Sequence, residues 1–155
     1  MNNLTIHIAQ DKKLRTYALF KTAFKFETYL DIFTDFTTRS TLAKLRTSAH
    51  KLQIEIGRYG TKKTPREERY CFYCKKRDLC KLEDEVHFLT ECPLFVEIRK
   101  DMLSNITGKF PSVELLHGKN LLIWLLSQED KFCLELVGKF CRTAFNLREK
   151  ALQKK

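Results

Sequence analysis

The middle of the chain carries four potential metal ligands with the spacing C-x2-C-x12-H-x4-C: Cys71, Cys74, His87 and Cys92. Two cysteines separated by two residues can both bring a thiolate to about 2.3 Å from one tetrahedral ion, and the later histidine and cysteine complete the site where the chain folds back. Because four protein ligands leave no open coordination position, a metal held in this way stabilises the fold and activates no substrate. The spacing therefore predicts one structural Zn²⁺.

Two other interpretations of the cysteines stay open. Cys80 lies between the two ligand pairs and could replace His87 in an all-thiolate site, although the charged segment around it is better suited to an exposed turn. The cysteines could also be reduced thiols that match the spacing by chance. Cys133 and Cys141 follow an apolar arc with no histidine nearby, so we expect buried thiols there. Three acids precede the histidine, and one of them could orient its second ring nitrogen: Glu83, Asp84 or Glu85.

The length and composition predict one folded domain. The chain has 155 residues, of which 43% are hydrophobic and 31% charged, and these values are typical of globular proteins and not of disordered ones. The N-terminus has no apolar run of the length that a secretory signal needs, and the longest apolar stretch, 121–126, is far too short to span a membrane. We therefore expect an intracellular protein, in a reducing compartment that keeps thiols free for metal.

The spacing of apolar residues predicts a mainly α fold with a small zinc-bound β-hairpin or knuckle inserted near the middle. Helical spacing is clear within 12–36 and again at 40–56, where Ser40 is the expected N-cap. After Cys92, helices are expected at about 93–105, at 113–127 with an interruption at Gly118, and from 129 onward. The single domain 1–155 then has four parts: N-terminal helices (1–38), a basic helix and loop (39–70), the zinc-binding segment (71–92) and C-terminal helices (93–155).

The positive charge of the chain is concentrated just before the cysteine cluster. The formal net charge is +10. Residues 39–69 hold nine Lys and Arg against three Glu, a balance of +6, whereas residues 71–100 hold six charges of each sign. A basic block of this kind favours an anionic partner, most often nucleic acid, and a solvated surface is the alternative. Nine residues are the expected phosphate contacts: Lys44, Arg46, His50, Lys51, Arg58, Lys62, Lys63, Arg66 and Arg69.

Several stretches resemble a known family: LRTYALFK, FETYL, LAKLRTSAHKLQIEIGRY, REERYCFYC and EDEVHFLTECPLF. They are similar to the zinc-binding C-terminal region of the reverse-transcriptase polyproteins of non-LTR retrotransposons. The resemblance covers about residues 13–99 and is most specific at 45–59 and 83–89. It implies the same four ligands, and it implies a tail that binds RNA or DNA. The chain departs from the family because it has no polymerase domain and no Asp-Asp pair.

A zinc-stabilised nucleic-acid-binding module is therefore the favoured function. Four aromatic residues beside the basic block could stack on unpaired bases, although Phe72 is better explained by packing near the zinc: Tyr59, Tyr70, Phe72 and Tyr73. The alternative is a protein-interaction or scaffolding module, in which the apolar C-terminal helices dock to a partner through 113–126. The sequence shows neither an open metal position nor a nucleophile beside a base, so we predict that the protein is not an enzyme.

Overall fold

The computed structural model describes residues 14–23, 25–33, 35–59 and 61–153, and these residues are mainly helical. The α-helices are α2 (Tyr29–Ile32), α3 (Phe36–Arg46), α4 (Gln53–Ile56), α5 (Phe72–Lys75), α6 (Val96–Lys109), α7 (Gly118–Ser127) and α8 (Lys131–Gln153). Shorter 3₁₀ turns are η1 (Tyr17–Leu19), η2 (Arg66–Glu68), η4 (Pro93–Phe95) and η5 (Pro111–Leu115), and η3 (His87–Glu91) is a π-helical turn. The mainly α prediction is confirmed.

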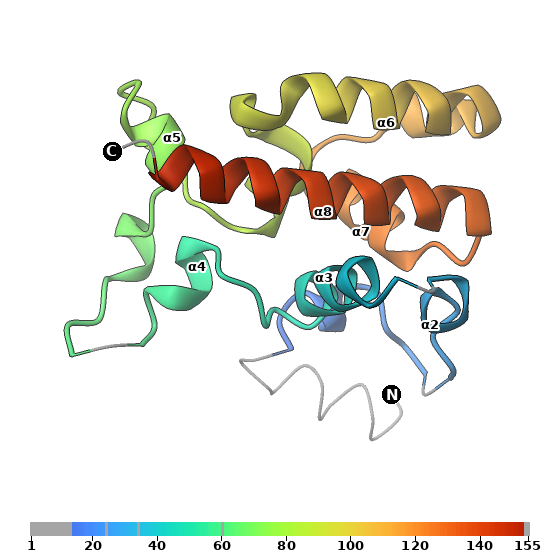
Figure 1. Ribbon diagram of the computed structural model, residues 1–155, viewed down its shortest axis with the longest axis horizontal. Helices are drawn as coiled ribbons and strands as arrows, with labels where there is room; N and C mark the ends of the chain where they lie inside the picture. Colours follow the sequence, from blue (N-terminus) through green and yellow to red (C-terminus); the bar gives the residue numbers. More distant parts are fainter. Residues whose placement is uncertain (1–13, 24, 34, 60, 154–155) are drawn as a thin grey trace.

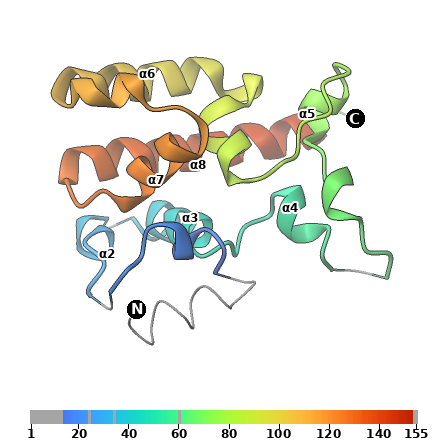
Figure 2. The ribbon, with the colours of Figure 1, turned by 180° about the vertical axis from the view of Figure 1, so that it is seen from behind.

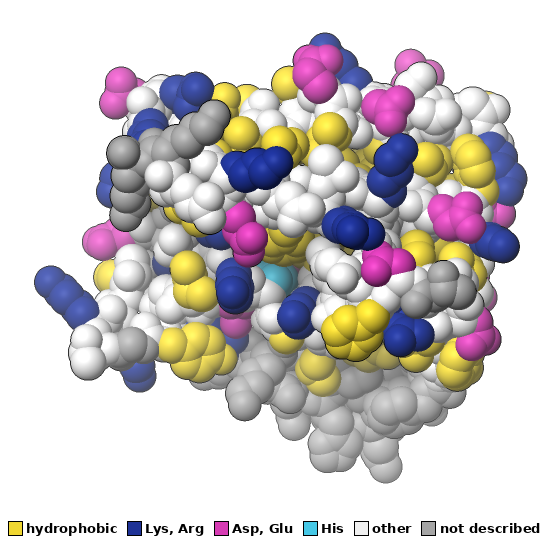
Figure 3. Space-filling view, viewed as in Figure 1, with side chains coloured by type: hydrophobic (Ala, Val, Ile, Leu, Met, Phe, Trp, Pro, Cys, Tyr) yellow, Lys and Arg dark blue, Asp and Glu magenta, His cyan; other side chains and the backbone are white. Residues whose placement is uncertain are grey.

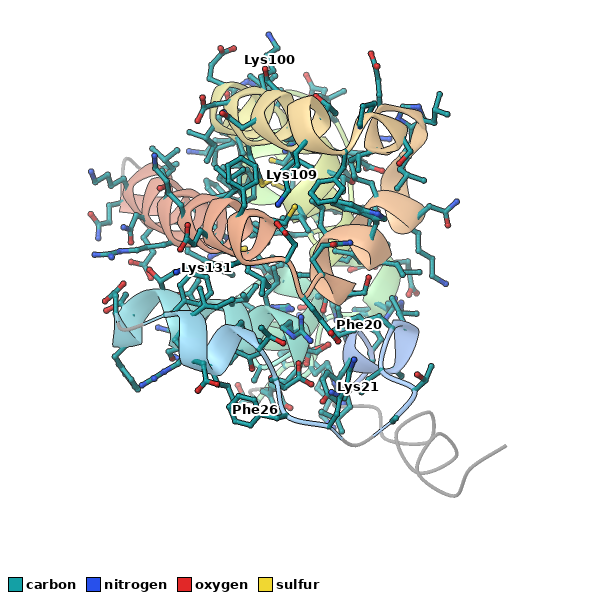
Figure 4. The ribbon with its side chains drawn as sticks, turned by 90° about the vertical axis from the view of Figure 1, so that its right-hand side faces the viewer. Phe20, Lys21, Phe26, Lys100, Lys109 and Lys131 are labelled. Atoms are coloured by element: carbon teal, nitrogen blue, oxygen red, sulfur yellow. The ribbon has the colours of Figure 1, made fainter. Side chains whose placement is uncertain are left out.

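The long helix α8 runs along the middle of the molecule and is covered on two sides. Figure 1 shows α6 on one side of it and the layer of α2, α3 and α4 on the other, and in Figure 2, seen from behind, α7 lies in front of it. Viewed from the end in Figure 4, Lys100 marks the outer α6, Lys131 the start of α8 and Phe20 the N-terminal layer. None of the described helices is both long and apolar enough to cross a membrane.

The buried face of α8 follows the helical period and includes both expected thiols. Cys133 and Cys141 are fully buried, as the sequence predicts, and Val137 and Phe140 lie between them on the same face. Burial raises the pKa of Cys133 to about 11 and that of Cys141 to about 12, so both thiols stay protonated at neutral pH. They pack as small hydrophobic side chains.

Gly138 on α8 packs tightly against Thr38 of α3 and against Phe33, which follows α2. A Cβ atom at this position would lie 2.5 Å from the ring tip of Phe33 and 2.9 Å from the methyl group of Thr38. Both neighbours are buried, so neither can move aside freely. The glycine is therefore required by packing, because only a residue without a side chain lets the two helices approach this closely.

The prediction of one helix at 40–56 is wrong, because the chain turns after Arg46. The helix α3 begins at Phe36, where the Asp35 carboxylate accepts the backbone N–H groups of Thr37 and Thr38. It ends in a Schellman motif: Ser48 has a φ of +56°, and the Ala49 N–H donates to the Lys44 carbonyl at 2.8 Å. The short helix α4 then starts at Gln53.

A serine replaces the usual glycine in this motif because its side chain has partners. The Ser48 hydroxyl accepts the backbone N–H of Thr16 at 3.1 Å and lies 2.9 Å from the Thr16 hydroxyl. Both residues are buried. The left-handed conformation of Ser48 is thereby offset by hydrogen bonds to the N-terminal segment.

The C-terminal helices match the predictions closely. The expected helix after Cys92 is η4 followed by α6, and the expected interruption at Gly118 separates η5 from α7. Four leucines of α7 are buried in the core: Leu121, Leu122, Leu125 and Leu126. Trp124 is half-buried and packs edge-on against Phe110, with the ring centroids 5.7 Å apart. The apolar segment 113–126 is thus mostly core, and its most exposed apolar side chain is Leu115.

The expected β-hairpin around the cysteines is not found among the described residues, which contain no β-strand. One isolated antiparallel bridge joins Tyr70 to Leu82. It consists of two backbone hydrogen bonds, from the Cys71 N–H to the Lys81 carbonyl at 2.8 Å and from the Glu83 N–H to the Arg69 carbonyl at 2.9 Å. The bridge does not extend because α5 begins immediately after Cys71 and turns the chain away.

Candidate metal centre

The four residues with metal-ligand spacing lie together in the structure and could bind a metal ion. The ligand atoms of Cys71, Cys74, His87 and Cys92 are all within 4.8 Å of one another, and all four residues are buried. The sulfurs of Cys71 and Cys92 are 3.9 Å apart, and the Cys74 sulfur lies 3.3 Å from His87 Nε2. Tetrahedral bonds of about 2.3 Å would separate two thiolate sulfurs by roughly 3.8 Å, so the spacing suits a single tetrahedral ion.

Local turns bring each ligand pair together. Cys71 precedes the first turn of α5, so Cys74 returns to the same side of the chain one turn later. His87 and Cys92 bound the π-helical turn η3, in which the Cys92 N–H donates to the His87 carbonyl at 2.7 Å. This wider turn places residues i and i+5 on one side, and so explains the H-x4-C spacing. The bridge at Tyr70 and Leu82 then holds the two pairs against each other.

The electrostatics of the protein alone allow one thiolate at this cluster. The Cys92 thiol donates a hydrogen bond to Cys71 and lowers the pKa of Cys71 to about 4. Burial, and then the charge of Cys71, raise the pKa of Cys74 to about 11. The hydrogen bond to Cys71, and then burial, raise the pKa of Cys92. Three thiolates at these distances would repel one another, and a divalent cation between them would offset that repulsion.

The second ring nitrogen of His87 faces an acid that the sequence prediction did not include. His87 Nδ1 is buried without a hydrogen-bond partner among the described residues and lies 3.7 Å from the Glu91 carboxylate. Of the three expected acids, Asp84 instead accepts the His87 backbone N–H at 2.9 Å and so caps the turn. A small movement of the half-exposed Glu91 would allow it to accept the Nδ1 proton, which would leave Nε2 free to bind a metal.

Cys80 does not belong to the cluster. It is exposed on the loop between α5 and the bridge, and the candidate metal site in the described part of the chain does not include it. The geometry therefore favours His87 over Cys80 as the fourth ligand.

The two other expected acids tie the metal segment to the rest of the fold. Glu83 forms two hydrogen bonds with Arg148 on α8, at 2.8 and 2.7 Å, and also accepts the backbone N–H of Gln53 at 2.8 Å. Figure 1 shows the resulting arrangement, in which the C-terminal end of α8 lies against α5. Because both charged groups are buried, this pair links α8, α4 and the metal segment.

Glu85 accepts hydrogen bonds from two elements that are distant in the sequence. His50 Nε2 lies 2.8 Å and the Arg15 guanidinium 2.5 Å from its carboxylate. Burial alone would raise the pKa of Glu85, but the hydrogen bond and charge of His50 and the charge of Arg15 outweigh it and lower this pKa to about 2. Arg15 also pairs with Glu55, so the N-terminal segment is fixed to the same cluster.

Three of the nine expected phosphate contacts point into the protein. Arg46 is 4% exposed, donates to the Leu126 carbonyl and pairs with Glu27 at 2.6 Å. Its guanidinium lies between the rings of Phe20 and Tyr29, at 4.6 and 4.9 Å from their centroids. Burial lowers the pKa of Arg46, although the charge of Glu27 opposes this change. Arg46 was expected to contact phosphate at the surface, but it is buried and bound to groups in the core.

His50 and Arg69 are the other two such residues. His50 is 6% exposed and accepts the Leu52 N–H at Nδ1 while its Nε2 faces Glu85. Arg69 donates to the carbonyls of Ile54 and Thr64, at 2.9 and 3.0 Å, and its side chain lies over Gly57. Both side chains are therefore bound within the fold, and the role of phosphate contact that the sequence predicted for them is not supported.

The remaining basic residues lie at the surface or close to it. Arg58 is half-buried and pairs with Glu55 at 2.9 Å. Five of the expected residues are exposed: Lys44, Lys51, Lys62, Lys63 and Arg66. Four more basic residues, which the sequence prediction missed, are exposed on and after α5: Lys75, Lys76, Arg77 and Lys81.

Charge counting over residues 71–100 concealed these four residues. The segment is neutral in sum, but Glu83 and Glu85 are buried in internal ion pairs and do not contribute to the surface. The signal that could have found them is the run Lys75-Lys76-Arg77 within the ligand loop itself. The aromatic residues beside this run are half-buried, and the Arg77 guanidinium lies 3.6 Å from the centroid of the Tyr73 ring. Phe72 packs beneath Arg148, with 5.8 Å between the guanidinium carbon and the ring centroid.

Comparisons of the chain with protein-family models, with curated proteins and with solved structures find no match. The resemblance to the retrotransposon tails thus stays a prediction from the motifs.

Proposed function

We propose that the protein is a zinc-stabilised module that binds nucleic acid through phosphates. The metal part of the proposal rests on the three sulfurs and one imidazole nitrogen that converge within the core. Thiolate and imidazole ligands in a tetrahedral arrangement suit Zn²⁺, and four protein ligands leave no position for a substrate. The role of the ion is then structural, as it would join the chain on either side of the bridge between Tyr70 and Leu82.

The observation that carries the binding part is a basic surface around the metal segment. Seven exposed residues define this zinc-loop surface: Lys62, Lys63, Arg66, Lys75, Lys76, Arg77 and Lys81. The exposed acids within 61–81 are Glu67, Glu68 and Asp78, so seven positive charges face three negative ones. Figure 1 places this segment along one end of the molecule, and Figure 3 shows dark blue Lys and Arg side chains along the same edge.

The lysines of this surface are available to an anionic ligand. Lys62, Lys63, Lys76 and Lys81 have no ion-pair partner among the residues that the structure describes. Phosphates bound by such groups would release counterions, which favours binding to nucleic acid with little dependence on sequence. The motif resemblance to nucleic-acid-binding retrotransposon tails supports the same function. The alternative of a protein-interaction module has less support, because the apolar segment 113–126 lies mostly in the core.

A salt titration with matched variants tests the proposal. The variant Lys62→Gln/Lys63→Gln/Lys76→Gln removes three charges from the zinc-loop surface, and Lys100→Gln/Lys119→Gln/Lys139→Gln removes three exposed charges from α6, α7 and α8. Binding to labelled single-stranded and duplex nucleic acid is measured at several salt concentrations, with equal zinc content. The salt slope is the magnitude of the slope of the logarithm of the binding constant against the logarithm of the salt concentration. We expect the first variant to lower this salt slope by about 2 to 3 and the control to change it much less. Equal affinities and slopes in both variants would refute phosphate binding by this surface.

A further inference from the structure

A groove between α3 and α8 is separate from the zinc-loop surface. It has a volume of about 260 Å³ and lies beside the crossing of the two helices, where the connection from α3 to α4 faces the second half of α8. Figure 3 shows a hollow in the middle of this face, with hydrophobic and histidine side chains at its floor and several Lys and Arg side chains around it.

One wall of the groove carries two uncommitted positive charges. Lys44 and Lys51 line it and are exposed, and neither has an ion pair within the described part of the chain. The two arginines that line the groove differ from them, because Arg142 pairs with Asp35 at 2.7 Å and Arg148 is held by Glu83. The lysines are therefore the groups that a bound anion would contact.

The opposite wall offers hydrogen-bond acceptors. Asn146 and Glu149 line the groove from α8, and no side-chain partner is found for either within residues 14–153 as described. The floor between the two walls is formed by Phe145 and His50. Phe145 is half-buried and packs against Phe88, with 4.5 Å between the two ring centroids. Both ring nitrogens of His50 are already hydrogen-bonded within the protein. The floor is therefore a fixed, largely apolar surface.

We infer that this groove holds one unpaired nucleotide whose base carries an exocyclic amino group, as cytosine and adenine do. The phosphate would contact Lys44 and Lys51, and the base would lie over the apolar floor. Its amino group would donate to Glu149 and Asn146, because a carboxylate accepts from the cytosine amino group and an amide pairs with adenine. An acidic peptide fits less well, since Glu149 would repel its carboxylates, whereas the base carries no negative charge. The inference rests on the proposed nucleic-acid binding and adds a base preference to it.

The test compares two bases whose hydrogen-bonding edges differ at positions 3 and 4. Cytosine has an amino donor at position 4 and an acceptor at N3, whereas uracil has a carbonyl oxygen at position 4 and an N–H at position 3. Labelled deoxycytidine and deoxyuridine oligomers of about 12 nucleotides are titrated with the zinc-loaded protein at moderate salt. We expect the deoxycytidine oligomer to bind about fivefold more tightly. The variant Asn146→Ala/Glu149→Gln should lose this preference, and Lys44→Gln/Lys51→Gln should weaken both oligomers and lower the salt slope by about 1.4. The matched controls on α6, Glu97→Gln and Lys100→Gln, should retain the preference; zinc content and melting temperature are measured for every variant.

The outcomes separate this inference from the proposed function. Equal, salt-dependent binding of the two oligomers would overturn the nucleotide site and leave binding by the zinc-loop surface intact. A preference that persists in Asn146→Ala/Glu149→Gln would likewise overturn it, because the base would then be read elsewhere. If neither oligomer binds, both the proposed function and the nucleotide site are overturned.

Discussion

Arg148 and Glu83 form a buried pair with two hydrogen bonds, and this pair joins the last turns of α8 to the segment that leads to His87. Each side chain is no more than 4% exposed. A buried charge that loses its partner is destabilising by several kcal/mol, so the pair couples the stability of α8 to that of the metal segment.

Removing one member of this pair should therefore be costly. We expect Arg148→Met to lower the free energy of unfolding by about 3 to 5 kcal/mol, because Glu83 would be left as an unpaired buried carboxylate. In the double variant Arg148→Met/Glu83→Gln this charge is also removed. The double variant should therefore lose less stability than the sum of the losses in the two single variants. Arg142→Met is the matched control on the same helix, and its pair with Asp35 is exposed. Denaturant unfolding that shows additive losses, or equal losses for Arg148 and Arg142, would contradict the coupling.

Metal analysis of ligand variants tests the proposed centre. We expect about one Zn²⁺ per purified chain, and we expect His87→Ala and Cys74→Ala to lose it and to unfold the middle of the chain. Cys80→Ala should keep its zinc because Cys80 is exposed outside the cluster, and Cys133→Ala should keep it because that thiol lies in the core of α8. Zinc content by elemental analysis and helicity by circular dichroism are the measurements. Loss of zinc from Cys80→Ala would mean that Cys80 is a ligand, contrary to the choice of His87.

Two glycines in helices should respond to alanine with opposite signs. At Gly138 a new methyl group would meet Phe33 and Thr38, so we expect Gly138→Ala to destabilise the protein by about 1 to 3 kcal/mol. At Gly108 in α6 nothing lies within 4 Å of such a methyl group, so Gly108→Ala should stabilise it by about 0.5 to 1 kcal/mol. Thermal unfolding of the two variants gives the comparison. A stabilising Gly138→Ala would show that α3 and α8 are less tightly packed.

The Glu27 carboxylate should make stability depend on acid pH. Burial would raise the pKa of Glu27, but hydrogen bonds from Lys21 and Tyr17 and the charges of Arg46 and Lys21 outweigh it and lower this pKa below 4.5. A lowered pKa means that its contribution is present above pH 4.5 and is lost as the pH falls through the lower folded-state value. We expect Glu27→Gln to be less stable than wild type at pH 7 by about 1 to 3 kcal/mol.

The difference between wild type and Glu27→Gln should then shrink steadily below pH 4.5. Glu97→Gln, on the exposed side of α6, is the matched control and should track wild type at all pH values. A difference that is independent of pH between neutrality and acid would mean that the carboxylate does not stabilise the fold through its charge.

The sequence predicts best where one physical constraint decides the outcome. Four ligands at fixed spacing must converge if they bind one ion, and the long apolar arc around Phe140 must be buried. It fails where a local rule is overridden by distant partners. Ser48 ends α3 in a conformation that usually calls for glycine, and only Thr16 reveals why. Arg46 has the sequence context of a surface residue, and its partner Glu27 could be identified only from the folded chain.

Glu83 and Glu85 form hydrogen bonds with residues that are synthesised at very different times during translation. Arg15 precedes Glu85 and already exists when Glu85 is synthesised, whereas Arg148 follows Glu83 by 65 residues. At about 5 to 20 residues per second, that separation corresponds to roughly 3 to 13 seconds of translation. A nascent chain thus has all four candidate ligands and the N-terminal partner before α8 is made, so the proposed zinc would bind before the last helix packs against its site.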